Sequence, residues 1–430
     1  MCFIHSDHLI SRRSFIQQCS VGTAAAAAIA GVGAKLAAAS EGVSAPGVGR
    51  PDVVVPVVDI DPPAGPVTTV DGFSKVLHNR WNHDIPAVVT VREGQAVQFL
   101  CRDALDIGTA ATTLKPSGIL TLDLAKVHPL TGPVSVEGAK PGDVLEVEIL
   151  DVAPLVDFGY VTIGPALGLF GGLRPDILAP FHQFSEASQL SDPNAGRVAG
   201  AIPEDQPFNS GAPFVQLFTF DKGQRTGFAS FVGKDTGKKA KIPIAPFMGV
   251  YGVAPLRKGM YRTVPPNVSG GMGGNMDIKQ FTKGSRIQFP VLADGAKFSA
   301  GDGHMAQGDG EICVTAIETL MAVTCTFRVI KDTIIESPRA IVPSANPTDF
   351  GLTPEMRAKG FYHTTGMGPD LMENAKKAAR DMIDWLVRAQ GLSLHEAYAI
   401  CSVAGDLKIS EVVDIPNWVV SMTVPRGIFE

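Results

Sequence analysis

The chain has few cysteines and few long apolar runs, and both features limit the classes of protein to which it can belong. Six cysteines occur in 430 residues and none forms a C-x-x-C pair, so zinc-ribbon and redox motifs are absent. Beyond the N-terminal leader, no apolar run is long enough to cross a bilayer. Dense runs of Lys and Arg are also missing, and the formal net charge is −6. We therefore expect no nucleic-acid partner and no stable membrane span.

Glycine and proline, by contrast, are abundant. The 46 glycines and 32 prolines favour many turns and short strands over a helical bundle. Residues 155–215 read as a long loop-rich excursion, and IPIAPFMGVYGVAPLRKGMYRTVPP as a rigid loop before residue 270. Helical spacing is clear only near the C-terminus. One helix is expected to begin at Pro369, and Ser393-x-x-Glu396 is a capping box for another helix through about Val403.

The N-terminus reads as an export signal. Arg12 and Arg13 precede an apolar, alanine-rich run, and small residues near Ala39 suit a signal peptidase. Paired arginines before such a run are typical of the twin-arginine pathway. We therefore expect the twin-arginine export machinery as a partner, cleavage near Ala39 and a periplasmic or secreted mature protein. Removing residues 1–39 takes the net charge from −6 to about −8 and leaves four cysteines. A Cys313–Cys325 disulfide is conceivable, but buried free thiols are favoured.

The densest polar stretch is AGDGHMAQGDGE, residues 300–311. Glycine allows close approach of backbone to ligand, and imidazole with carboxylates binds metals or moves protons. Upstream, SGGMGGNMDIKQ places Asn275, Asp277 and Lys279 on one face if the segment is extended. Turns built from Asp and Gly are the alternative interpretation. Together the two stretches predict a functional site.

Four further residues, outside these two stretches, need an interpretation. His128 precedes Pro129 in a loop and is a candidate site residue. Trp81 could form a binding wall or cap a core. In VLEVEILDV, Glu146 and Glu148 alternate with apolar residues and predict a solvated strand face.

Several motifs together resemble the acetamidase/formamidase family. They are HNRWNHDIPAVVTV, DLAKVHPLTGPVSVEGAKPGDVLEVEILDV, PFMGVYGVAP, GGNMDIK, FSAGDGHMAQGDGEI and the tail LSLHEAYAICSVAGDLKISEVVD. They occur in the family's order across residues 70–425. The resemblance implies a β-rich α+β fold, with a β-sandwich or barrel-like core, and hydrolysis of short aliphatic amides to acid and ammonia. We expect three segments: the signal peptide 1–39, a β-rich core 40–345 that resembles this family and carries the site, and a C-terminal α+β segment 346–430 packed on it.

The resemblance also implies a divalent metal, with zinc as the expected ion, and a small amide substrate. Asp277, Asp302 and His304 are expected as metal ligands. Catalytic roles are expected for Glu311 (as base), His128 and Asp309, while Asn275 and Gln307 bind substrate. A homo-oligomer is expected. The alternative is a non-catalytic periplasmic binding protein on the same fold.

Two departures from the family pattern stand out. Met276 occupies the position where formamidase-type members carry Cys, and PLTGP after His128 is closer to the acetamidase branch. No GGSS-type serine motif is present. The leader departs from cytoplasmic members and leaves the identity of the amide open.

Overall fold

The computed structural model describes residues 51–55, 77–119, 122, 127–164, 168–170, 213–256, 261–263, 271–342, 351–413 and 415–430. The chain divides into two compact units, Met1–Ser44 and Ala45–Glu430, and every described residue belongs to the second. The predicted leader, its cleavage position and most of the 155–215 excursion lie outside the described residues. The predicted boundary between core and C-terminal segment stays a prediction.

Six strands form one mixed sheet in the order β1-β5-β18-β7-β15-β19. Their bounds are β1 (Val53–Val55), β5 (Val97–Cys101), β7 (Val144–Pro154), β15 (Arg286–Pro290), β18 (Met321–Ile330) and β19 (Arg339–Ile341). The two long central strands, β7 and β18, are mostly buried. The solvated face predicted for β7 holds for Glu148, which is exposed. It does not hold for Glu146, which is buried and accepts hydrogen bonds from Gln288 and Arg328.

The second sheet has eleven strands, and β16 lies at its centre. Its main path runs β11-β10-β9-β8-β17-β16-β12-β14, and β6 joins β16 to β2 and β4. The bounds are β2 (Leu77–His78), β4 (Val89–Val91), β6 (Leu130–Val136), β8 (Phe158–Ile163), β9 (Phe214–Thr219), β10 (Phe228–Val232), β11 (Lys239–Pro243), β12 (Phe247–Gly252), β14 (Gly273–Asn275), β16 (Phe298–His304) and β17 (Glu318–Thr319). A separate ribbon pairs β3 (Arg80–Trp81) with β13 (Tyr261–Arg262).

The two sheets meet over a buried aromatic cluster at the start of β16. The ring of Phe298 lies 5.7 Å from Phe99, 5.4 Å from Phe327 and 5.9 Å from Phe289. All three of these rings belong to the six-stranded sheet. Edge-to-face packing of this kind adds about 0.5–1.5 kcal/mol per pair beyond area burial. Trp81 is also fully buried, which confirms its interpretation as a core residue. The cluster therefore holds β16 firmly at one end, while its other end carries the polar residues described below.

Two segments predicted as loops are strands. The segment predicted as a rigid loop contains β12, whose six residues are all buried between β14 and β16. The excursion from residue 155 begins with β8. Glycine and proline misled the prediction, because a strand hydrogen-bonded on both sides tolerates glycine where another backbone or side chain must approach closely.

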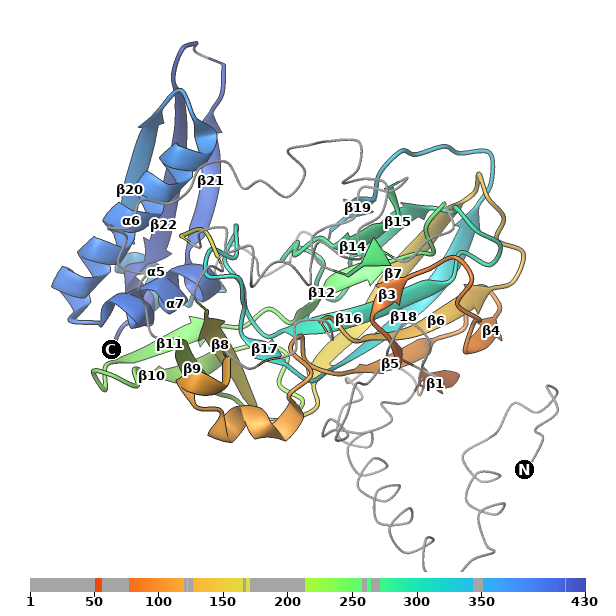
Figure 1. The fold of residues 1–430 in the computed structure, drawn as a ribbon, viewed down its shortest axis with the longest axis horizontal. Helices are drawn as coiled ribbons and strands as arrows, with labels where there is room; N and C mark the ends of the chain where they lie inside the picture. The colour runs from red at the N-terminus through yellow and green to blue at the C-terminus, as the bar shows by residue number, and fades with distance from the viewer. Residues whose placement is uncertain are drawn as a thin grey trace, which may run out of the picture. The chain divides into compact units, whose positions relative to one another are not determined.

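The C-terminal segment is a three-stranded sheet, β20-β22-β21, with a long helix on one face (Figure 1). It comprises α5 (Pro354–Ala358), β20 (Phe361–Gly368), α6 (Leu371–Gln390), α7 (Leu394–Ala404), β21 (Asp406–Glu411), β22 (Trp418–Pro425) and the 3₁₀ helix η4 (Arg426–Ile428). Helix α6 begins after the N-cap Asp370, not at Pro369 as predicted. The capping box at α7 is confirmed. Two short helices elsewhere, η1 (Gly108–Thr113) and α3 (Pro116–Ile119), follow β5.

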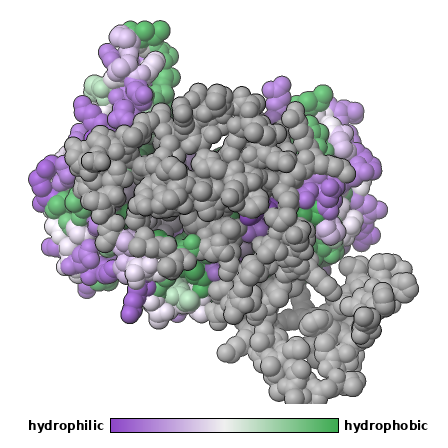
Figure 2. Space-filling view, viewed as in Figure 1, coloured by the Kyte–Doolittle hydropathy of each residue, from purple (hydrophilic) through white to green (hydrophobic). Residues whose placement is uncertain are grey.

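Hydrophobic side chains gather where β21 turns into β22. Ile409, Val413 and Ile415 are largely exposed there, and Figure 2 shows hydrophobic colouring at this end of the sheet, at upper left. Cys101, Cys313, Cys325 and Cys401 are buried free thiols, as favoured from the sequence. Among the described helices, none is long and apolar enough to cross a membrane. The β-rich α+β fold class is confirmed.

Candidate functional site

The candidate site is built on three adjacent strands of the eleven-stranded sheet. On β16, His304 lies opposite Phe247 of β12 on one side and opposite Glu318 of β17 on the other. Glu318 in turn lies opposite Tyr160 of β8. Residues directly opposite in a ladder project to the same face. His304, Glu318 and Tyr160 therefore form a row across the sheet.

Carboxylates surround the His304 imidazole at short range. Its Nε2 lies 3.0 Å from Asp302 Oδ1, 3.3 Å from Glu318 Oε2 and 3.8 Å from Glu311 Oε1. The ring edge packs on Phe247 with centroids 5.0 Å apart. His304, Asp302 and Glu318 are all buried. The alternative interpretation of this stretch as turns does not hold at His304, because β16 continues through it and the imidazole is held by a strand.

Gln307 determines which nitrogen of His304 carries the proton. Its Oε1 lies 2.9 Å from His304 Nδ1, and its Nε2 donates to the Asp277 carbonyl oxygen at 2.7 Å. An amide oxygen only accepts, so Nδ1 must donate. Nε2 is thereby directed at the carboxylates. Both polar atoms of Gln307 are engaged within the protein, which makes it an orienting residue for His304; its predicted substrate contact stays a prediction.

Gly249 of β12 makes room for the cluster. A Cβ at this position would lie 2.5 Å from Asp277 Oδ1, 2.6 Å from Asp302 Oδ2 and 2.7 Å from His304 Cε1. Real Cβ atoms essentially never approach so closely, and none of the three atoms belongs to a long, flexible side chain. The sequence prediction did not include Gly249, because the segment around it was interpreted as a loop.

Burial and mutual repulsion shift the carboxyl groups of the cluster strongly. Burial raises the pKa of Glu318 to about 8, and burial with the Asp302 charge raises the pKa of Asp277 to about 7. Burial and the Asp277 charge raise the pKa of Glu311 well above its usual range. Asp302 behaves oppositely, because His128 and His304 outweigh its burial and lower its pKa. So many carboxyls at one place cannot all be ionised unless a cation balances them.

A divalent metal fits these residues. Two sets of residues could each hold an ion: Asp277, His304 and Glu311 form one, and Asp302, His304 and Glu318 form the other. Within each set, the ligand atoms all lie within 4.8 Å of one another. Asp277 Oδ1 and Glu318 Oε2 are buried and have no hydrogen-bond partner, as metal-ligand oxygens would. Carboxylate and imidazole ligands suit zinc. Glu318 was missed from the sequence, although a single acid inside the apolar run ICVTAIETLMAV was a signal for it.

Of the remaining predicted residues, Asn275 and His128 lie beside carboxylates of the cluster, whereas Asp309 does not. Asn275 Nδ2 donates to Asp277 Oδ2 at 2.9 Å, and its buried Oδ1 has no hydrogen-bond partner. His128 Nδ1 lies 3.6 Å from Asp302 Oδ2. Asp309 lies apart from both sets of ligand atoms, with its carboxylate 3.8 Å from Lys279 Nζ and 3.9 Å from Lys408 Nζ. Asn275, Asp277 and Lys279 do not share an extended face, because Asp277 adopts a φ of 48°.

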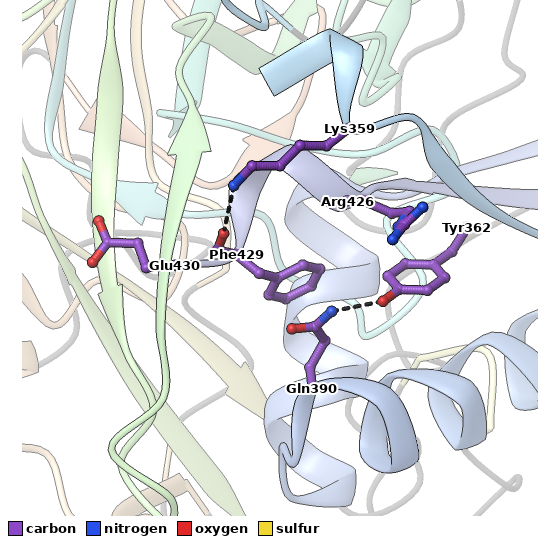
Figure 3. Close-up of a pocket in the computed structure, with 6 residues that line it drawn as sticks. All are labelled: Lys359, Tyr362, Gln390, Arg426, Phe429 and Glu430. Atoms are coloured by element: carbon purple, nitrogen blue, oxygen red, sulfur yellow. Dashed lines mark hydrogen bonds between the residues drawn. The ribbon is translucent and has the colours of Figure 1, made fainter. Parts of the chain in front are cut away.

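A separate pocket lies in the C-terminal segment (Figure 3). It has a volume of about 370 Å³ and is lined by Lys359, Tyr362, Gln390, Arg426, Phe429 and Glu430. Gln390 donates to the Tyr362 hydroxyl across it. None of the clustered carboxylates or histidines lines this pocket, so it is not the space in which they would act.

Comparison with known proteins gives consistent matches over most of the chain. The model of the acetamidase/formamidase family matches residues 68–258 and 252–430. An acetamidase from Mycolicibacterium smegmatis is 32% identical over 255 residues, which are 55% of this chain and 61% of that protein. This chain thus matches only about three fifths of that relative. A formamidase from Methylophilus methylotrophus is 30% identical over 394 residues, covering 82% of this chain and 89% of the relative.

Solved structures also match, and a γ-lactamase is one of them. A γ-lactamase from Delftia acidovorans superposes with a TM-score of 0.65 at 23% identity, covering 88% of this chain and 93% of that one.

Proposed function

Because the chain belongs to the acetamidase/formamidase family, we propose that it hydrolyses short linear amides, such as acetamide or formamide, to the carboxylic acid and ammonia with the help of a divalent metal. The observation that carries the proposal is the cluster around His304, in which two buried carboxylate oxygens, Asp277 Oδ1 and Glu318 Oε2, accept no hydrogen bond. It lies wholly within the matched region. The names of the relatives supply the substrate class.

The proposed ligands are Asp277 and Asp302 with His304, joined by Glu318. Bound there, a metal such as zinc would lower the pKa of water and withdraw charge from the amide oxygen. Gln307 supports this role of His304, because it holds the proton on Nδ1 and leaves Nε2 directed at the carboxylates.

Hydrolysis also requires proton transfer. Water adds to the carbonyl carbon, the C–N bond breaks, and the proton lost by water must reach the departing nitrogen. Glu311 is the proposed base and shuttle, since its side chain keeps 15% exposure and lies beside the cluster. Burial and the neighbouring Asp277 charge raise its pKa, which is the direction that favours accepting a proton. Asn275 is the proposed substrate-binding residue: its Oδ1 would accept from the substrate N–H group, since its Nδ2 already donates to Asp277.

The test is ammonia release from a panel of formamide, acetamide and propionamide, with metal content measured on the same samples. Glu311→Gln should keep the metal and lower kcat by about 10²–10⁴. His304→Ala should lose both metal and turnover, and a chelator should do the same reversibly. The exposed Glu148→Gln serves as the matched control. A near wild-type rate for Glu311→Gln would show that Glu311 is not the base.

Two results would oppose the wider proposal. Full activity of the metal-free protein would remove the metal from the mechanism. Metal and amide binding without any ammonia release would favour the binding-protein alternative.

A further inference from the structure

The loop that carries Gln307 and Glu311 is held by the C-terminal segment of the chain. Gly308 N donates to the Ser402 carbonyl oxygen at 2.7 Å, and Leu407 N donates to the Asp309 carbonyl oxygen at 3.0 Å. A Cβ at Gly308 would overlap the Gly405 carbonyl oxygen. The loop backbone therefore packs directly on the end of α7 and the start of β21.

Two side chains of α7 extend this contact. The Tyr398 hydroxyl donates to the Ile312 carbonyl oxygen. The Ser402 hydroxyl accepts from Cys313 N at 3.2 Å and donates to the Thr315 carbonyl oxygen at 2.9 Å. Tyr398 and Ser402 are four residues apart and so lie on one face of the helix. Hydrogen bonds to α7 thus hold the backbone of residues 308–315 at several positions along one face of the helix.

A buried ion pair joins this contact to the metal-ligand segment. Lys279 Nζ, from the segment that supplies Asp277, donates to Asp406 Oδ1. The same Asp406 oxygen accepts from Asp309 N at 3.1 Å. The two side chains are only 6% and 2% exposed. Asp406 is therefore the point at which the Asp277 segment, the Glu311 loop and β21 are tied together.

Stability alone is a weak reason for such a pair. The desolvation of two buried charges offsets most of their attraction, and well-packed apolar residues of similar volume are often as stable. What the pair does supply is a defined position, because each charge must meet its partner. A shift of about 1 Å in a site loop is enough to lower a rate about 10²-fold.

We propose that Lys279 and Asp406 are positioning residues for the site: they hold the Glu311 loop against the Asp277 segment, so that the C-terminal segment completes the metal and proton-transfer groups. This inference rests on the proposed function for its catalytic consequence, but not for its structural one. Neither residue contacts the proposed substrate; both act through Asp277, Gln307 and Glu311.

The first experiment compares Lys279→Met with wild type by hydrogen exchange of residues 308–311 and by calorimetric titration with zinc alone. The variant should exchange faster in this loop and bind zinc about 10-fold more weakly, because the Asp277 segment and the loop of Gln307, which orients His304, are no longer held together. Where turnover is measured, kcat should fall with KM changed less than about threefold, because substrate contacts remain. Lys408→Met is the matched control: it removes a half-exposed lysine beside the same two aspartates and should leave all three quantities unchanged.

The double variant Lys279→Met/Asp406→Leu separates positioning from stability. Removing both charges should recover much of the unfolding free energy lost in Lys279→Met, while zinc affinity and loop exchange stay impaired. Recovery of wild-type zinc affinity in the double variant, or unchanged exchange in Lys279→Met, would overturn the proposal. Neither readout requires turnover. A wild-type protein that releases no ammonia would overturn the proposed function and leave the positioning result to be decided by exchange.

Discussion

Three carboxylate residues of the site adopt left-handed backbone conformations. Asp277, Asp302 and Glu311 have φ values of 48°, 63° and 42°. Non-glycine residues in this region carry about 1–3 kcal/mol of strain each, which surrounding structure must offset. Strained backbone conformations cluster at functional sites, because the direction of a functional side chain there depends on the conformation of its backbone. The three φ values agree with a site in which the carboxylates are directed at His304.

Gly249 gives the sharpest prediction at the residue scale. Gly249→Ala places a methyl group among Asp277, Asp302 and His304, so it should displace them and abolish metal binding and turnover. Overpacking of this kind costs about 1–3 kcal/mol, which should leave the protein folded. Elemental analysis and thermal unfolding of the variant measure the two effects. Gly118→Ala, which meets only the mobile end of Leu114, should change neither; retained metal in Gly249→Ala would contradict the assigned geometry.

His78 predicts a pH dependence that is independent of the site. Its ring is buried and hydrogen-bonded to Ser299 Oγ and the Arg80 carbonyl oxygen. Burial lowers its pKa from 6.5 to about 4, despite the bond to Arg80. Between these values the unfolded chain binds a proton that the folded protein does not, so stability falls as pH drops from 6.5 to 4. The loss at pH 4 is on the order of 3 kcal/mol.

Urea unfolding at several pH values measures this effect. His78→Gln should show a shallower loss of stability than wild type between pH 6.5 and 4. The exposed His363→Gln should match the wild-type slope. Equal slopes for wild type and His78→Gln would contradict the prediction.

Among the elements, helix α7 contacts both the turn between β10 and β11 and the loop that carries Glu311. Its capping residue Glu396 also accepts hydrogen bonds from Asp235 N, Thr236 N and the Thr236 hydroxyl. The capping box recognised in the sequence therefore also connects the helix to the turn between β10 and β11. From there the helix runs to Tyr398 and Ser402, which hold the site loop.

Glu396→Ala should be strongly destabilising. It removes the acceptor that the Asp235 N–H, the Thr236 N–H and the Thr236 hydroxyl share, and each of these hydrogen bonds contributes about 0.5–1.5 kcal/mol. Asp370→Ala removes only the N-cap of α6 and should cost about 1 kcal/mol. Chemical unfolding of both variants gives the comparison. A smaller loss for Glu396→Ala than for Asp370→Ala would mean that the contacts to the β10–β11 turn contribute nothing.

At the scale of the whole molecule, the site draws on two regions of the chain that are far apart in sequence. The ligands come from residues 277–318, and the groups that hold their loop come from residues 398–407. The C-terminal segment, expected simply to pack on the core, supplies contacts to the loop that carries Glu311. The leader lies outside the described residues, and its predicted export function concerns the protein as a whole.

We propose that the mature protein is exported by the twin-arginine pathway to the periplasm or beyond. Changing Arg12 and Arg13 both to lysine keeps the charge but removes the arginine pair. Fractionation of the expressing cells should then find uncleaved precursor in the cytoplasm. A matched Lys35→Arg variant should be exported normally. Undiminished periplasmic protein from the Lys-Lys variant would show that the leader is not read by this pathway.

The sequence by itself determined the class of the fold, the family and most of the members of the site. Abundant glycine and proline excluded a helical bundle, the capping box located α7, and the GGNMD and GDGHMAQGDGE stretches contained Asp277, Asp302, His304 and Glu311. These signals are local, since caps, turns and short motifs depend on residues adjacent along the chain.

Tertiary structure alone decided the partners of those residues. Glu318 and Gly249 enter the site through pairing of β16 with β17 and β12, and Asp406 through contact with a segment about 100 residues away. Asp309 fitted the local motif as well as Glu311 did, yet it pairs with Lys279. Register between strands and burial of charge depend on the whole set of contacts that exclude water. No spacing along the chain encodes them, because residues distant in sequence compete for the same buried partner.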